Sequence, residues 1–382
     1  MTARSRTEKH RASTPLELFF DLCFVVAVAQ AGKRLLPAVA EGHAATGIAS
    51  YAAVFFAIWW AWVNFTWFAS AYDTDDPIYR VVTFVQIAGV LILAAGVPRA
   101  FDSGDWTVGL AGYVVMRLAM TSQWLRVAYR TRGSERRVAV RYAVGIAVVQ
   151  LGWIGMVALT GDKGEARAAA YVVLVLAELS VPAFAEHDRA TSWHPHHIGE
   201  RYGLFTIIVL GETVAAATVA VQEALDEHEA FAELLPIAAG GLLIVFSAWW
   251  IYFAVPIHDY LRGSREAFVW GYGHFLIFGA AAAIGSGIEV AVEEAVGQAH
   301  VSDTVAAAAV TVPSALFLLT VWALHVRHFK RDLAEQLLLP VASLAILVCT
   351  GAGGWAVFAA GLVAAATVAV GVTLSRRPAP AR

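Results

Sequence analysis

Two carboxylates stand at the head of an otherwise apolar run, Glu17 and Asp21 in STPLELFFDLCFVVAVAQ (13 to 30). They are four residues apart, about 40° around a helix, so both side chains point the same way. Charges inside a membrane are costly and usually mark an ion pathway, a proton relay or a buried pair. For Glu17 the favoured alternative is a capping box, with Thr14 as N-cap and Pro15 as the first helical residue. Asp21 lies one turn deeper, beyond capping reach, and is expected to work in a pathway or to form a salt bridge.

A second charged run is HHIGERYGLFTIIVLGETVAAATVAVQ (196 to 222), which holds Arg201 and Glu212. Eleven residues separate them, about 20° around a helix, so they share one stripe. Arg201 is near the end of the run, where snorkelling to the interface would serve it. Glu212 lies in the middle, where a carboxylate needs a partner or a proton. Glu212 is therefore the strongest single candidate for a functional residue.

Three further polar residues interrupt apolar runs. Arg117 is near the middle of GYVVMRLAMTSQW and is the natural counter-charge for Asp21 or Glu212, in a structural pair or a functional one. Glu178 and His274 are expected more often to form helix-to-helix hydrogen bonds than to form a site. Because acids outnumber Arg117 in these runs, at least one carboxylate is predicted to be protonated or to face water or a cation.

The sequence shows no pattern that is typical of a metal or cofactor site. The two cysteines, Cys23 and Cys349, lie in apolar runs, which excludes a disulfide framework or a cysteine-rich metal site. The histidine-rich stretch EHDRATSWHPHHIGER (186 to 201) matches no standard metal spacing, and Pro195 interrupts any helix there. No nucleophile elbow, phosphate loop or dinucleotide fingerprint is present. We expect no metal, no cofactor and no catalytic residue, and an enzyme is the less favoured reading.

The elements that must position these residues are membrane helices. The chain has 382 residues, of which 59% are hydrophobic and 15% charged, against about 25% charged in soluble proteins. The thirteen tryptophans lie mostly within spans or at their ends, as interfacial anchors and packing residues. The fold class predicted is all-α, a polytopic bundle of about twelve spans, in which the eleventh is short and re-entrant or merged with the twelfth across TGAGG. These spans are about 15 to 37, 46 to 70, 79 to 98, 106 to 129, 138 to 159, 166 to 185, 200 to 222, 235 to 257, 267 to 291, 303 to 328, 335 to 350 and 353 to 374.

The positive charges predict the orientation. Lys and Arg collect on the cytoplasmic side in short loops. With twelve spans, the basic tail (1 to 14), RVAYRTRGSERRVAVR (126 to 141) and the end of the chain (375 to 382) all fall inside. Lys33 and Arg34 are exceptions. We expect a multipass protein of the inner (plasma) membrane, with no cleaved signal peptide and with both termini in the cytoplasm.

The two halves of the sequence resemble each other. FFDLCFVVAVAQ (19 to 30) is similar to LGETVAAATVAVQ (210 to 222), and IWWAWVNF (58 to 65) is similar to AWWIYFAV (248 to 255). The spacing from acid to tryptophan differs by one residue between the halves. We predict a duplicated six-helix unit, residues 15 to 190 and 191 to 374. Because six is even, the repeats would be parallel, about an axis near the membrane normal.

These motifs identify a family resemblance. TPLELFFDLCFVVAVAQ and HHIGERYGLFTIIVLGETV together resemble the bacterial low-temperature-requirement A (LtrA) family of multipass membrane proteins, over nearly the whole chain. The family name describes a phenotype and implies no reaction. A fainter similarity is to potassium channels built from six-helix repeats, whose first helix bears Phe-Ser-Asp; here the Ser is missing and Arg11 is too far upstream. The positions that match the LtrA family are Glu17, Phe20, Asp21, Glu200, Arg201, Gly203, Gly211 and Glu212.

Three functions remain open. The leading hypothesis is an ion or proton-coupled small-solute transporter or channel in which Asp21 and Glu212 line a polar pathway, with Arg117 as switchable partner. The second is a membrane-embedded enzyme acting on lipid. The third is a structural membrane-adaptation protein, needed for growth at low temperature. The expected partners are the lipid bilayer, a small ion or solute and a further copy of the chain, and no nucleic acid.

Overall fold

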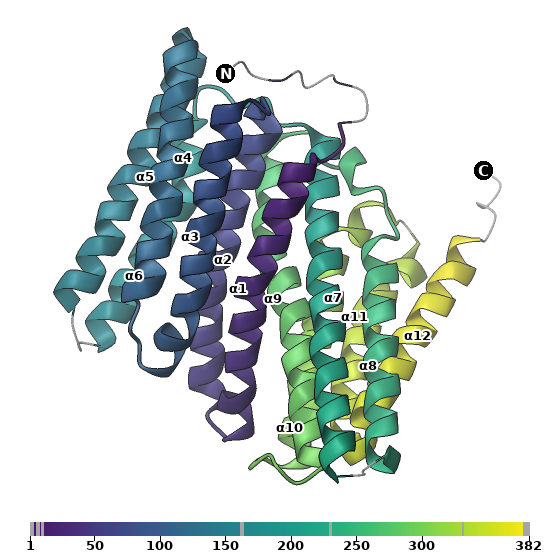
Figure 1. Cartoon of the computed structure of the whole chain (residues 1–382). Coiled ribbons are helices and arrows are strands. Elements are labelled where there is room, and N and C mark those ends of the chain that lie inside the picture. The colour runs from purple at the N-terminus through teal and green to yellow at the C-terminus, as the bar shows by residue number, and fades with distance from the viewer. Residues whose placement is uncertain are drawn as a thin grey trace. The chain divides into compact units, whose positions relative to one another are not determined.

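The computed structural model describes residues 4, 8, 11–160, 164–228, 231–330 and 332–376, which excludes most of the two tails predicted at 1 to 14 and 375 to 382. These residues form an all-α fold (Figure 1). The α-helices run close to the expected spans, most of them a few residues longer. Their bounds are α1 Pro15–Ala40, α2 Ala44–Tyr72, α3 Pro77–Asp102, α4 Thr107–Arg130, α5 Gly133–Thr160, α6 Gly164–Ala185, α7 Pro195–His228, α8 Phe231–Tyr252, α9 Ser264–Ala295, α10 Asp303–Leu324, α11 Leu333–Cys349 and α12 Ala356–Ser375.

Within the described residues, ten stretches are long and apolar enough to cross a membrane. The helix α4, which carries Arg117, Arg126 and Arg130, is not among them. The stretch from α11 to α12 counts as one of 43 residues, joined through a 3₁₀ segment in which Gly353 breaks the helix with φ of 57°. Ten candidate spans thus stand where about twelve were predicted. A multipass membrane protein is what this set of helices requires.

The chain divides into two compact units. One consists of Met1–Gln30 and Val54–Tyr202, and the other of Ala31–Ala53 and Gly203–Arg382. The helices α1, α2 and α7 each contribute to both units, because the division falls inside them. This division does not test the predicted parallel repeat of residues 15 to 190 and 191 to 374, which stays a prediction.

In the first unit, α3 to α6 lie side by side, each against the next (Figure 1). The closest approach is between α3 and α4, where a methyl group on Gly112 would overlap the backbone of Leu93. Small residues allow such close packing of membrane helices, which hold together by van der Waals contact. Large apolar side chains on the other faces of these helices, such as Leu118 and Leu151, are exposed and suit contact with lipid.

In the second unit, α9 is the most deeply packed of the candidate spans, with 78% of its apolar window buried. It lies against α10 at Gly287, where a methyl group would overlap the carbonyl of Ala309. The helices α8 and α12 meet in the same manner through Gly240 and Gly361. Backbone contact at these glycines fixes the pairing of helices around the core of the unit.

Candidate functional site

The first turn of α1 forms the capping box expected from its sequence. The Glu17 amide donates to Thr14 Oγ1 at 3.3 Å, and the Thr14 amide donates to Glu17 Oε2 at 2.8 Å. The capping prediction for Glu17 is therefore confirmed. The Glu17 carboxylate has a second role besides capping. Its side chain is fully buried and also contacts His197 and Arg201 of α7.

Arg201 on α7 bridges both acids of α1. Its Nη1 lies 3.1 Å from Glu17 Oε1, and its Nη2 lies 2.5 Å from Asp21 Oδ1. The indole of Trp62 on α2 donates to the same Asp21 oxygen at 2.7 Å. Three helices of the first unit thus meet at one buried ion pair, and the shared face predicted for Glu17 and Asp21 is the face that Arg201 contacts.

Aromatic rings seal this ion pair from solvent. Phe20 stacks on Phe65 with ring centroids 3.7 Å apart, and the Arg201 guanidinium lies 5.8 Å from the centre of the Phe65 ring. The side chains of Glu17, Asp21 and Arg201 are each 0% exposed. The expectation that Arg201 snorkels to the interface is wrong, because its two acidic partners hold it inside the bundle. In such an enclosed setting its Coulomb interactions are far stronger than in water.

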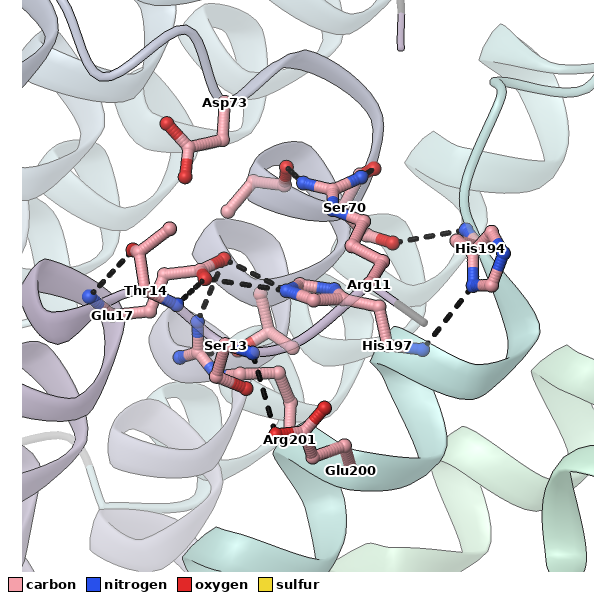
Figure 2. A network of polar contacts seen from close by, with 12 residues as sticks. Arg11, Ser13, Thr14, Glu17, Ser70, Asp73, His194, His197, Glu200 and Arg201 are labelled. Carbon is pink, nitrogen blue, oxygen red and sulfur yellow. Dashed lines mark hydrogen bonds and ion pairs between the residues drawn. The ribbon is translucent and has the colours of Figure 1, made fainter. Parts of the chain in front are cut away.

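A second group of polar side chains surrounds Glu17, as Figure 2 shows. His197 Nε2 lies 3.1 Å from Glu17 Oε1, and the His197 amide donates to His194 Nδ1 at 3.4 Å. The His194 amide donates to the Ser70 hydroxyl at 3.0 Å. Arg11 donates to the backbone carbonyls of Ser70 and Ala69 at the end of α2. Two residues of the histidine-rich stretch, His194 and His197, therefore belong to this network.

Asp73 stands at the edge of the network, just beyond α2, and is 4% exposed (Figure 2). Its Oδ1 accepts a hydrogen bond from the Asp75 amide at 2.9 Å, while its Oδ2 is buried without a hydrogen bond to any described residue. Burial, reinforced by the negative charge of Glu17, raises the pKa of Asp73 to about 6. Burial has the opposite effect on the imidazole of His194: it lowers the pKa of His194 and so favours the neutral form.

The charges of this cluster do not balance. Among the described residues, three buried acids, Glu17, Asp21 and Asp73, face two buried arginines, Arg11 and Arg201, when the histidines are neutral. A net negative charge in a buried setting is costly, and a proton or cation relieves it. The protonated or cation-facing carboxylate stays a prediction, for which these acids at the ends of α1, α2 and α7 are the candidates.

Arg117 lies elsewhere in the first unit and is not the partner of Asp21. Its Nη2 lies 2.7 Å from Glu178 Oε2 on α6, and it also donates to the Tyr113 hydroxyl at 2.7 Å. The indoles of Trp60 and Trp153 donate to the two Glu178 oxygens at 2.8 and 3.1 Å. The two charges neutralise each other and both Glu178 oxygens accept hydrogen bonds, so this pair ties α2, α4, α5 and α6 together. Arg117 as switchable partner of Asp21 is therefore wrong.

The remaining candidates lie apart from the charge cluster or at its margin. Glu200 is half-buried and accepts a hydrogen bond from the Ser13 amide at 3.3 Å. Glu212 belongs to the second unit, where it is half-buried and interacts electrostatically with Glu289. His274, also in the second unit, is fully buried between the Trp270 carbonyl, at 2.7 Å, and the Tyr252 hydroxyl, at 3.0 Å.

Several residues that contact the buried charges are not predicted from the sequence. Tryptophans were assigned to anchoring and packing, yet the indoles of Trp62, Trp60 and Trp153 are buried donors to carboxylates. A signal was available in the alternation of IWWAWVNF, which places several indoles around one helix. Arg11 and Asp73 carried no such signal, since both lie outside the apolar runs.

Comparison with known proteins agrees with this architecture. The family described as bacterial low temperature requirement A protein (LtrA) matches residues 12–374. The chain is also similar to the uncharacterized protein RA0937 of Rhizobium meliloti (strain 1021), with 27% identity over 296 residues. That alignment covers 72% of this chain and 68% of the relative.

Proposed function

The chain belongs to the bacterial low temperature requirement A family of multipass membrane proteins, and we propose that it transports protons or small cations through the buried cluster of Glu17, Asp21 and Arg201. The observation that carries the proposal is the charge imbalance of this cluster. Two carboxylates of one helix share one guanidinium at 0% exposure, and Asp73 adds a third acid at the edge. With Arg11 included, three carboxylates face two guanidinium groups, so one further positive charge, a proton or a cation, would balance the cluster.

The geometry suggests how the charge would be exchanged. Arg201 holds Glu17 and Asp21 through different nitrogens, at 3.1 and 2.5 Å, so protonating either carboxylate leaves the guanidinium bound to the other. The loss of one ion pair weakens the attachment of α7 to α1 without breaking it. A two-state element whose helix contacts depend on a bound proton is the basis of proton-coupled transport.

Asp73 is the proposed entry point for this proton. It lies outside the candidate spans, and its pKa of about 6 allows it to bind and release a proton near neutral pH. Glu17 is close enough for its charge to raise that pKa, so the two carboxylates are electrostatically linked. In the orientation predicted from the positive loops, this end of the first unit faces the cytoplasm.

The test is a flux assay on the full chain in proteoliposomes. We expect the wild type to dissipate an imposed proton, sodium or potassium gradient, and we expect Asp21→Asn to abolish most of that flux at matched incorporation. Asp188→Asn is the matched control, because Asp188 pairs with Arg141 at 2.8 Å and its side chain is 40% exposed. It should keep the wild-type flux.

Two results would contradict the proposal. One is a folded wild-type protein that carries none of the three ions in either direction. The other is an Asp21→Asn variant with undiminished flux. Glu212→Gln, assayed beside them, tests separately whether the acid of the second unit belongs to the pathway.

A further inference from the structure

The second unit contains a cavity of about 310 Å³ at the end of α8, α11 and α12. Pockets that hold small organic ligands begin at about 300 Å³. Its walls are apolar, with Ile251 on α8, Leu339 on α11 and Val368 on α12. Trp250, which also lines it, is 51% exposed, as is usual for a tryptophan at a membrane interface. The interior is therefore suited to hydrocarbon.

The rim of this cavity is charged. Lys330 and Arg376 line it together with Glu335 and Ser375. Lys330 Nζ lies 2.7 Å from Glu335 Oε1 and donates to the Ser375 hydroxyl at 2.9 Å. Two cations against one acid leave a net positive charge, which favours an anionic group at the mouth. Arg376 offers the planar donor arrangement that suits a phosphate.

A second cavity of the same unit has the opposite charge. It measures about 350 Å³ and is lined by Glu233, Glu294 and Asp303, with no Lys or Arg among the described residues that form it. It is close to the first in size but would repel an anion. The contrast shows that charge, more than space, distinguishes the two cavities.

We infer that the cavity at the ends of α8, α11 and α12 binds an anionic phospholipid. The phosphate group lies between Lys330 and Arg376, and the upper part of an acyl chain lies against Ile251, Leu339 and Val368. Basic pockets between membrane helices recognise anionic headgroups in this way. The site lies in the second unit and is independent of the charge cluster of the first.

The experiment is native mass spectrometry of the delipidated full chain in detergent. Phosphatidylglycerol and phosphatidylcholine with identical acyl chains are added separately. We expect a preference for phosphatidylglycerol, reduced about five-fold for each cation removed in Lys330→Gln and Arg376→Gln. The matched control is Arg262→Gln with Arg265→Gln, two cations near the junction of α8 and α9 that do not line the cavity.

A cavity-filling variant tests the acyl chain. Gly371 on α12 lines the cavity, and a Cβ there would meet Leu338 at 3.4 Å, an ordinary contact. Gly371→Leu is expected to keep the fold and to weaken the binding of both lipids. Unchanged lipid binding in this variant would overturn the proposal.

Three other results would also overturn it. The first is equal binding of the two lipids by the wild type. The second is an equal loss of preference in the control variant. The third is competition by inorganic phosphate as strong as that by the whole lipid, which would make the site one for a free anion.

Discussion

Replacing Asp73 by asparagine is expected to stabilise the protein at neutral pH. The Asp73 carboxyl is buried beside the negative Glu17, and one of its oxygens has no hydrogen bond to a described residue. Asparagine has the same shape and keeps an oxygen that can accept the hydrogen bond from the Asp75 amide. The substitution therefore removes a buried charge and preserves the turn.

The size of the effect follows from the pKa. Folding raises the pKa of Asp73 from 3.8 to about 6, chiefly by burial, so the folded state binds the proton more tightly than the unfolded state does. The corresponding stability is fully present below about pH 3.8 and is lost as the pH rises through about 6. A difference of about two pKa units corresponds to about 3 kcal/mol, an upper value for the gain expected from Asp73→Asn above about pH 7.

The assay is the thermal midpoint of unfolding of the full chain in detergent, followed by tryptophan fluorescence from about pH 4 to about pH 7.5. The difference between Asp73→Asn and wild type should be small at the acid end, grow between about pH 4 and 6, and then level off. Asp75→Asn should differ from wild type by a nearly constant amount over this range, because a hydrogen bond from Arg80 lowers the pKa of Asp75 and the stability that this gives is lost only as the pH falls below about 3.8. For Asp73→Asn, a constant difference across this range, or a lower stability than wild type at neutral pH, would refute the argument from burial.

Three further predictions concern the helix contacts. Arg201→Met should destabilise the protein by about 3 to 5 kcal/mol, measured in the same assay, since it leaves two buried carboxylates without their cation; an unchanged midpoint would mean that the ion pair adds nothing to the fold. Trp62→Phe removes the donor to Asp21 and should cost about 1 to 3 kcal/mol, and Asp21→Asn should lessen this cost in a double-mutant cycle. Gly112→Ala should lower the midpoint by forcing α3 and α4 apart, whereas Gly155→Ala, with open space at its Cβ, should not.

Much of the fold could be read from the sequence. Long apolar runs, the basic loops and the capping residues at Thr14 and Glu17 are local properties, and the helices form close to where those properties placed them. Two local features of the sequence made the number of spans harder to predict. The helix α4 carries several arginines, and the chain between α11 and α12 bends at Gly353 without a polar loop.

The pairing of the buried charges could not be predicted from the sequence. The sequence predicted Arg117 as the counter-charge for Asp21 or Glu212 and Arg201 as a residue that snorkels to the interface. Helical spacing could say only that Glu17 and Asp21 share a face. The structure pairs Arg201 with those two acids and Arg117 with Glu178, because α7 meets α1 and α6 meets α4 within the first unit.

The amino-acid sequence by itself thus determined that this is a multipass helical membrane protein of a bacterial family, with costly charges inside its apolar runs. Hydrocarbon imposes those properties on each helix separately, through its length, its apolar composition and its ends. The tertiary structure alone decided which charges neutralise one another and which carboxylates are buried. Coulomb energy and desolvation depend on distances between helices far apart in sequence, and no spacing along one helix contains them.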